Sequence, residues 1–128
     1  MSAERVTARA ILLCGQEILL VHRRRGSEAY HVLPGGGIED DESPIEACRR
    51  KVREETGLDV PHLRAVEGDD ALPRSMHLFS AEVTDPHVRL GGPEASRSTP
   101  DNRYELVWVA IEVLAGISLR PDALKAQV

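Results

Sequence analysis

The residues best suited to chemistry are two adjacent carboxylates, Glu54 and Glu55, which end a segment that begins with three glycines at 35–37. An acidic run at 39–42 lies between the glycines and the stretch that carries the pair. Carboxylate oxygens are ligands that hard divalent cations such as Mg²⁺ prefer. Glycines let backbone amides and carbonyls approach a ligand closely. The combination therefore predicts an ion or phosphate site.

A helix over residues 44–56 is expected to position the two glutamates. Ser43 is a suitable N-cap, Pro44 suits the first helical position, and Glu46 falls at the third. Ser43 and Glu46 thus form a capping box, in which each side chain accepts a hydrogen bond from the other residue's backbone N–H. Gly57 is the expected left-handed residue that ends the helix.

Glu55 should lie beside the buried face of this helix. Ile45, Cys48 and Val52 recur at helical spacing and form one apolar stripe. At about 100° per residue, Glu55 falls about 40° from the middle of that stripe. A buried carboxylate without a partner costs several kcal/mol or more. We therefore expect either a metal ion or Lys51, one turn earlier, to supply a positive charge.

The pattern resembles the signature of the Nudix hydrolases: Gly, five residues, Glu, seven residues, Arg-Glu, an aliphatic, any residue, Glu-Glu, any residue, Gly, an aliphatic. Eight of the nine specified positions match over 23 residues, namely Gly36, Glu42, Arg50, Val52, Glu54, Glu55, Gly57 and Leu58. The exception is Lys51, which stands where the family has the glutamate that follows the arginine.

The resemblance implies an α/β architecture, the Nudix fold, in which a mixed β-sheet is sandwiched between helices. It also implies one Nudix domain over residues 1–128. The implied activity is hydrolysis of the diphosphate linkage in a nucleoside diphosphate derivative, with Mg²⁺ or Mn²⁺ as the cofactor. The expected partner is therefore a small nucleotide-type substrate.

By the same resemblance, Glu54, Glu55 and the carbonyl of Gly35 would be metal ligands. Arg50 would be part of the catalytic group in an orienting role, and Glu42 would brace the loop against the helix. The assignments of the three glutamates and Arg50 follow from the matching positions in the family's motif, and Gly35 directly precedes the motif.

A further carboxylate often comes from a loop outside the motif in this family. Glu105, which follows a long stretch of loop composition at 91–102, is our candidate. Asp101 and Glu94 are the alternatives.

Lys51 changes the local charge by two units relative to a glutamate. Unit charges about 4 Å apart interact by roughly 4 kcal/mol at an effective dielectric constant near 20.

Three outcomes are open for Lys51. Lys51 pairs with Glu55 and fills the metal site, leaving a Nudix-fold module that binds a ligand without hydrolysing it. Alternatively it leans away along its flexible stem and leaves a slower one-metal enzyme, or another carboxylate replaces the missing one.

Residues 23–27 are expected to form a basic loop, and Arg23 and Arg24 are its candidate substrate contacts. Arginine suits bidentate recognition of phosphate oxygens. In Nudix relatives the matching strand end borders the substrate cleft. The alternative is a solvated connection.

The remaining elements follow from aliphatic and β-branched runs separated by glycine and proline. Strands are expected at 6–14, 17–22, 30–33, 60–67, 76–83 and 104–110, and helical turns at 112–115 and 121–126. The glycines at 35–37 are expected to form a turn. Phe79, Tyr104 and Trp108 are assigned to the core.

A net charge of −5 argues against a nucleic-acid polymer as partner, because such binders need a basic face. It leaves a small anionic substrate possible, since a bound cation reverses the local sign of the charge.

No run approaches the ~20 apolar residues of a membrane span, and no leader sequence is recognised. Cys14 and Cys48 form no paired motif and suit a reducing compartment. We expect a soluble cytoplasmic protein without membrane contact; a homodimer is left open.

Overall fold

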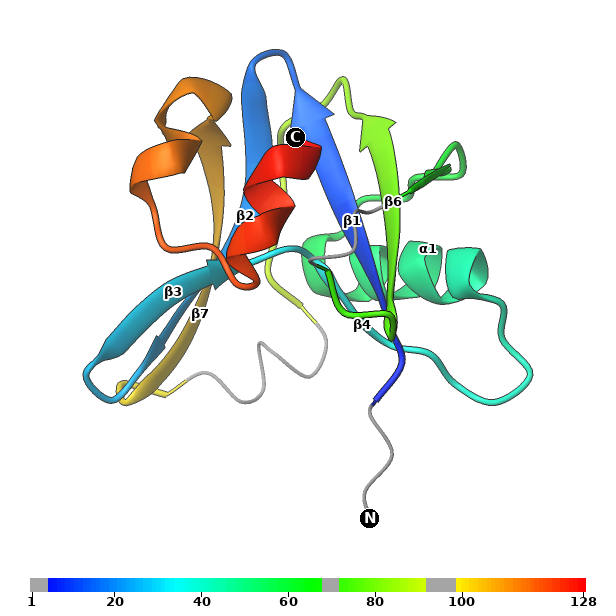
Figure 1. Ribbon diagram of the computed structural model, residues 1–128, viewed down its shortest axis with the longest axis horizontal. Helices are drawn as coiled ribbons and strands as arrows, with labels where there is room; N and C mark the ends of the chain where they lie inside the picture. The colour runs from blue at the N-terminus through cyan, green and yellow to red at the C-terminus, as the bar shows by residue number, and fades with distance from the viewer. Residues whose placement is uncertain (1–4, 68–71, 92–98) are drawn as a thin grey trace.

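The computed structural model describes residues 5–67, 72–91 and 99–128, and its main feature is a seven-stranded mixed β-sheet (Figure 1). The strands are β1 (Thr7–Cys14), β2 (Glu17–Arg25), β3 (Glu28–Val32), β4 (Gly35–Gly37), β5 (Arg64–Val66), β6 (Met76–Glu82) and β7 (Asn102–Ala110). The helical elements are α1 (Pro44–Thr56) and two 3₁₀ helices, η1 (Ile111–Gly116) and η2 (Asp122–Gln127).

The strand order is β3-β2-β1-β6-β5, with β4 paired to β1 and β7 paired to β2. β1 and β6 are parallel, and every other pair between these strands is antiparallel. The sheet is therefore mixed, as expected from the sequence.

The hairpin formed by β1 and β2 opens after two residue pairs. The two strands pair only at Leu13 with Ile18 and at Cys14 with Glu17. Beyond that point the first residues of β1 pair with β4 instead, while β2 pairs with β3 on one side and β7 on the other. The divergence of β1 and β2 leaves space between them on one face of the sheet.

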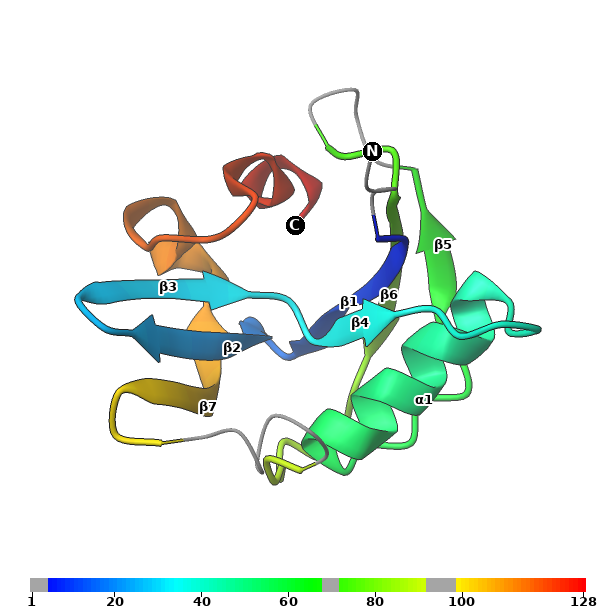
Figure 2. The ribbon, with the colours of Figure 1, turned by 90° about the horizontal axis from the view of Figure 1, so that it is seen from below.

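Each face of the sheet has its own apolar core. One core packs the buried side of α1 against the sheet and includes Cys48, Val52 and Phe79. The other lies beneath η1 and η2 and includes Leu33, with Leu124 from the end of the chain. Figure 2 shows α1 on one side of the strands and the two 3₁₀ helices on the other. The mixed sheet with helices on both faces is the expected Nudix architecture.

The helix begins and ends where its local signals predict. Ser43 accepts a hydrogen bond from the backbone N–H of Glu46, whose side chain accepts one from the backbone N–H of Ser43. Gly57 ends the helix with φ +80°. One prediction was wrong: Ile45 is 41% exposed, because it lies in the first turn, before the buried positions begin at Ala47.

Two further predictions need correction. Residues 23–25 are not in a loop: β2 continues through Arg25, because both of its neighbours, β3 and β7, pair with it to that residue. The turn begins at Gly26, whose φ is +60°. Residues 35–37 are not a turn but the short strand β4, which pairs with β1. Pairing with a strand distant in sequence contributes to both corrections, β7 in the first and β1 in the second.

Within the described part of the chain, none of the helices combines the length and apolar character needed to cross a membrane. Of the stretch expected to be a loop at 91–102, residues 92–98 lie outside the described residues, and so does the alternative ligand Glu94.

Candidate functional site

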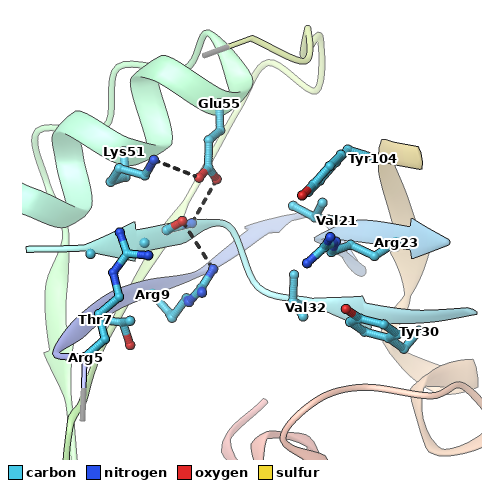
Figure 3. Close-up of a pocket in the computed structure, with 13 residues that line it drawn as sticks. Arg5, Thr7, Arg9, Val21, Arg23, Tyr30, Val32, Lys51, Glu55 and Tyr104 are labelled. Atoms are coloured by element: carbon cyan, nitrogen blue, oxygen red, sulfur yellow. Dashed lines mark hydrogen bonds and ion pairs between the residues drawn. The ribbon is translucent and has the colours of Figure 1, made fainter. Parts of the chain in front are cut away.

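A cavity of about 330 Å³ opens where β1 and β2 diverge. Strands β1, β2, β3, β4 and β7 and the last two turns of α1 all contribute side chains or backbone to its wall. Figure 3 shows Lys51 and Glu55 descending from the helix toward the glycine strand, with Arg5 and Arg9 beneath it and Arg23 on the far side. The site therefore brings together residues that are far apart in the sequence, from Arg5 to Tyr104.

Glu55 is the buried carboxylate at the centre of one wall. The residue is only 2% exposed. Its Oε2 accepts a hydrogen bond of 3.1 Å from the backbone N–H of Gly35, and its Oε1 lies 3.4 Å from Lys51 Nζ. The expectation that Glu55 is buried beside a positive charge is confirmed, and that charge is the lysine.

Lys51 lies between the two neighbouring carboxylates. Its Nζ is 3.4 Å from Glu55 Oε1 and 3.9 Å from Glu54 Oε2. The residue is 9% exposed, and its stem crosses Gly36: a Cβ on that glycine would lie 2.5 Å from Lys51 Cε. The first of the three outcomes open from the sequence began with a contact between Lys51 and Glu55, and the structure shows that contact.

Gly35 cannot be another residue without moving the backbone. Its φ is +136°, and a Cβ there would lie 2.1 Å from the carbonyl oxygen of Ala8. This close approach places the Gly35 N–H against Glu55. The carbonyl of Gly35 accepts a hydrogen bond of 3.2 Å from Arg9 Nη1, which also donates to the Leu33 carbonyl at 3.1 Å.

Arg50 connects the segment before the helix to the last turn of the helix. Its Nε donates to Glu42 Oε2 at 2.7 Å, and its Nη2 donates to Glu42 Oε1 at 3.0 Å and to the Gly37 carbonyl at 3.3 Å. Its Nη1 donates to both carboxylate oxygens of Glu54, at 3.2 and 3.3 Å. The guanidinium holds the pKa of Glu42 below its usual range, and the carboxylates raise the pKa of Arg50. Glu42 therefore braces the loop against the helix.

The end of α1 is held in place by the chain that follows β6. The backbone N–H of Gly91 donates to the Glu55 carbonyl at 2.9 Å, and that of Arg89 donates to the Thr56 carbonyl at 2.9 Å. These bonds satisfy helix carbonyls that would otherwise lack partners. They position the turn that carries Glu54 and Glu55.

The thiol of Cys48, on the same helix, is not a nucleophile. Cys48 is fully buried, and burial, followed by the negative charge of Glu55, raises its pKa to about 12. The thiol therefore stays protonated at neutral pH, as expected for a small core residue.

Arg23 forms the opposite wall of the cavity. Its guanidinium lies over the ring of Tyr104, with Cζ 4.3 Å from the centroid, and 5.8 Å from the centroid of Tyr30. Its Nη2 donates to Asn102 Oδ1 at 3.1 Å. Its Nε is buried and has no hydrogen-bond partner among the described residues. Tyr104 is half-buried and lines the cavity, so its assignment to the core was wrong.

Four of the predicted site residues, Arg24, Arg50, Glu54 and Glu105, are not among those that line the cavity. Arg24 follows Arg23 and is exposed, because successive side chains of a strand point to opposite faces. The same alternation separates Glu105 from Tyr104. The Glu105 side chain is 71% exposed and lies 3.9 Å from His22 Nδ1. The structure therefore does not bring Glu105 together with Glu54 and Glu55. The alternative Asp101 is exposed as well.

The residues present do not fit a divalent ion in this arrangement. Among the described residues no group of three or more His, Cys, Asp or Glu side chains is placed to hold a metal. The three ligands predicted in and beside the motif instead contact cationic side chains: Gly35 contacts Arg9, Glu55 contacts Lys51, and Glu54 contacts both Arg50 and Lys51. An ammonium in this position opposes a second positive charge.

Sequence reasoning missed Arg5, Arg9 and Thr7, which line the cavity from the first residues of the chain. The sequence did contain a signal for Thr7 and Arg9. Thr7 and Arg9 alternate with buried alanines in an otherwise apolar strand, which is the pattern of a strand with one polar face. The sequence offers no comparable signal for Arg5, which precedes the strand.

Comparison with known proteins gives a family match over nearly the whole chain: the NUDIX domain model matches residues 3–126. An RNA pyrophosphohydrolase from Thioalkalivibrio sulfidiphilus is 39% identical over 56 residues. That match spans 44% of this chain and only 32% of the relative's length.

Solved structures show the same fold. A MutT structure, from work on Aliivibrio salmonicida and Vibrio cholerae, matches with a TM-score of 0.68 at 23% identity, covering 95% of this chain and 91% of that one. The NUDIX domain of Shewanella oneidensis NrtR, solved with ADP ribose, matches with a TM-score of 0.70 at 20% identity, covering 98% of this chain and 85% of that one.

Proposed function

Because this chain belongs to the Nudix family, we propose that it hydrolyses the diphosphate linkage of a nucleoside diphosphate derivative bound in the cavity between β1 and β2. The observation that carries the proposal is the position of Glu55. The end of the helix places this carboxylate against the Gly35 backbone at the wall of a cavity lined by arginines. Buried acidic groups in a basic cleft are typical of a functional site.

The proposed cofactor is Mg²⁺ or Mn²⁺, and the support for it is family membership rather than the geometry. Glu54, Glu55 and the Gly35 carbonyl are the proposed ligands, and Arg50 is the proposed orienting residue. Because Lys51 Nζ lies 3.4 Å from Glu55 Oε1, we propose that the ion binds more weakly than it would with a carboxylate at position 51.

The proposed substrate contact is Arg23, which lines the cavity and is held by Asn102 and the ring of Tyr104. The matched NrtR structure contains ADP ribose, which is itself a nucleoside diphosphate derivative. Arg24 remains a candidate only for parts of a substrate that extend beyond the cavity, since it is exposed.

One observation favours a second candidate function, a Nudix-fold module that binds its ligand without hydrolysis. The ammonium of Lys51 already neutralises Glu55, so the buried carboxylate has a partner without any ion. In this case the ligand is of the same class, but no cleavage follows.

The test is metal-dependent turnover by the wild type and by Lys51→Glu. The panel contains ADP ribose, other nucleoside diphosphate derivatives, and an RNA with a terminal diphosphate, because a matched relative is an RNA pyrophosphohydrolase. We expect slow turnover by the wild type at high Mg²⁺ or Mn²⁺. In Lys51→Glu the metal concentration for half-maximal rate should fall by at least about tenfold, because the local charge changes by two units.

The matched control is Arg53→Glu, which makes the same change of charge at an exposed position of the same helix. Its metal dependence should equal that of the wild type. Turnover by Lys51→Glu alone would favour the binding module, and no turnover by either protein would contradict the hydrolase proposal for this panel.

A further inference from the structure

We infer that this cavity holds a diphosphate group through the protein's own cations, with Lys51 in the place of a metal ligand, so that the ligand binds without a divalent ion. The inference deepens the proposed function and rests on it in taking the same cavity as the ligand site. It does not depend on hydrolysis, because binding and cleavage are measured separately.

The first support is the charge of the cavity. Arg5, Arg9, Arg23 and Lys51 line it, and Glu55 is the one carboxylate among the described lining residues. The chain as a whole carries a net charge of −5, so this concentration of positive charge is local. Basic side chains gathered around a concave surface attract anions, and low-dielectric walls strengthen that attraction.

The second support is that the glycine strand makes room for two of these cations. A Cβ on Gly36 would lie 2.5 Å from Lys51 Cε, and a Cβ on Gly37 would lie 2.4 Å from Arg5 Nη2. Any other residue at either position would push the charged side chain away. The bare backbone of β4 thus sets where the Lys51 stem and the Arg5 guanidinium lie.

The third support is that protein cations already contact the oxygens proposed as metal ligands. Arg9 Nη1 donates to the Gly35 carbonyl at 3.2 Å, and Lys51 Nζ lies 3.4 Å from Glu55. The positive charge that a divalent ion would bring to this wall is supplied by these two side chains. They come from different elements, β1 and α1, so the arrangement is part of the folded structure.

The fourth support is the fixed position of Arg23, which lines the opposite wall of the cavity. The guanidinium is held by Asn102 and lies over the Tyr104 ring, so it cannot turn without losing both contacts. Arginine N–H groups match phosphate oxygens in geometry, so a guanidinium held in this way on the cavity wall suits a phosphate group.

Lys51 and Arg5 on one wall and Arg23 on the other suit a ligand with more than one negative charge, because cations line the cavity from both sides. A diphosphate is such a ligand, whereas a nucleoside without phosphates has no charge for these side chains to contact. The ligand class is therefore a compound that carries a diphosphate group.

The experiment is calorimetric titration of the whole chain with inorganic pyrophosphate in the presence of excess EDTA, with adenosine as the uncharged control. We expect the wild type to bind pyrophosphate in EDTA and not to bind adenosine. Lys51→Met, Arg5→Gln and Arg23→Gln should each weaken binding by about tenfold or more. Arg49→Met, an exposed change on the same helix, should leave the affinity unchanged.

Arg5→Gln keeps the test decisive if Lys51→Met fails to fold, because Arg5 is exposed and precedes the first strand. Pyrophosphate binding by the wild type only when Mg²⁺ or Mn²⁺ is added would overturn the inference. Binding in EDTA that none of the three cavity variants weakens would also overturn it, because the anion would then lie elsewhere. If the wild type binds pyrophosphate in EDTA but turns over no substrate of the panel, only the hydrolase proposal is contradicted.

Discussion

Whether the site binds a divalent ion depends mainly on one pair of side chains, Lys51 and Glu55. Both residues are buried, and the ammonium and carboxylate are 3.4 Å apart. Removing one partner of a buried ion pair leaves an uncompensated charge in a low-dielectric setting. The pair therefore has consequences for stability as well as for ligand binding.

We predict that Lys51→Met lowers the free energy of unfolding by about 3–5 kcal/mol, because Glu55 stays buried without the ammonium. Adding Glu55→Gln to the variant should recover part of the loss. Urea unfolding followed by circular dichroism measures both changes. Arg49→Met is the control: Arg49 and its partner Asp59 are both half exposed, so this substitution should cost much less than Lys51→Met. Equal effects of the two methionine substitutions would show that the Lys51 pair has no special role.

At the scale of the element, α1 and the loop before it behave as one unit. The capping box sets where the helix begins, and Arg50 joins the loop residue Glu42 to Glu54 in the final turns. Backbone bonds from Arg89 and Gly91 hold the C-terminal end. The position of Glu55 against Gly35 therefore depends on contacts along the whole helix.

The Glu42–Arg50 contact should make stability depend on pH. Hydrogen bonding from Arg50 lowers the pKa of Glu42 from its ordinary value of 4.5. A group whose pKa is lower in the folded state contributes stability above its unfolded pKa and loses it as pH falls through the folded pKa. The contribution should therefore be complete at about pH 7 and should be lost progressively as the pH falls below the ordinary pKa of 4.5.

We predict that Glu42→Gln is less stable than the wild type at about pH 7, and that this difference shrinks as the pH is lowered to about 3. Urea midpoints at several pH values measure the difference. Other carboxylates, including Asp59 and Asp85, also have lowered pKa values, so the wild type loses stability in acid for several reasons. The difference between the two proteins isolates Glu42, and a difference that stays constant with pH would contradict its assigned role.

At the scale of the whole molecule, the sheet separates two cores, and the end of the chain covers the second one. Leu124 in η2 is 1% exposed and packs in the core that contains Leu33, directly before the glycine strand. The site on one face of the sheet is thus supported by packing on the other. The expectation of one domain over residues 1–128 stays a prediction.

We predict that Leu124→Ala lowers the free energy of unfolding by about 2–5 kcal/mol, because it removes a large side chain from a packed core. Val113→Ala, at a 51% exposed position in η1, should change it by less than about 0.5 kcal/mol. Thermal or urea unfolding of both variants provides the measurement. A small effect of the Leu124 change would mean that the C-terminal segment is not part of the cooperative structure.

The sequence by itself determined where the helix begins and ends, and it indicated the family to which the chain belongs. Capping residues and the closing glycine act through hydrogen bonds within a few residues, so Ser43, Glu46 and Gly57 could be interpreted without knowing the rest of the fold. The family signature is likewise one continuous stretch. The burial of Glu55 followed from helical spacing, which is also local.

Only the tertiary structure decided what surrounds that helix. Strand pairing extended β2 through Arg25, placed Arg23 in the cavity and left Arg24 and Glu105 outside it. The divergence of β1 from β2 brought Arg9 to the Gly35 carbonyl, 26 positions away in the chain. Sequence spacing does not encode such contacts, because the register between distant strands is set by the packing of both faces of the sheet.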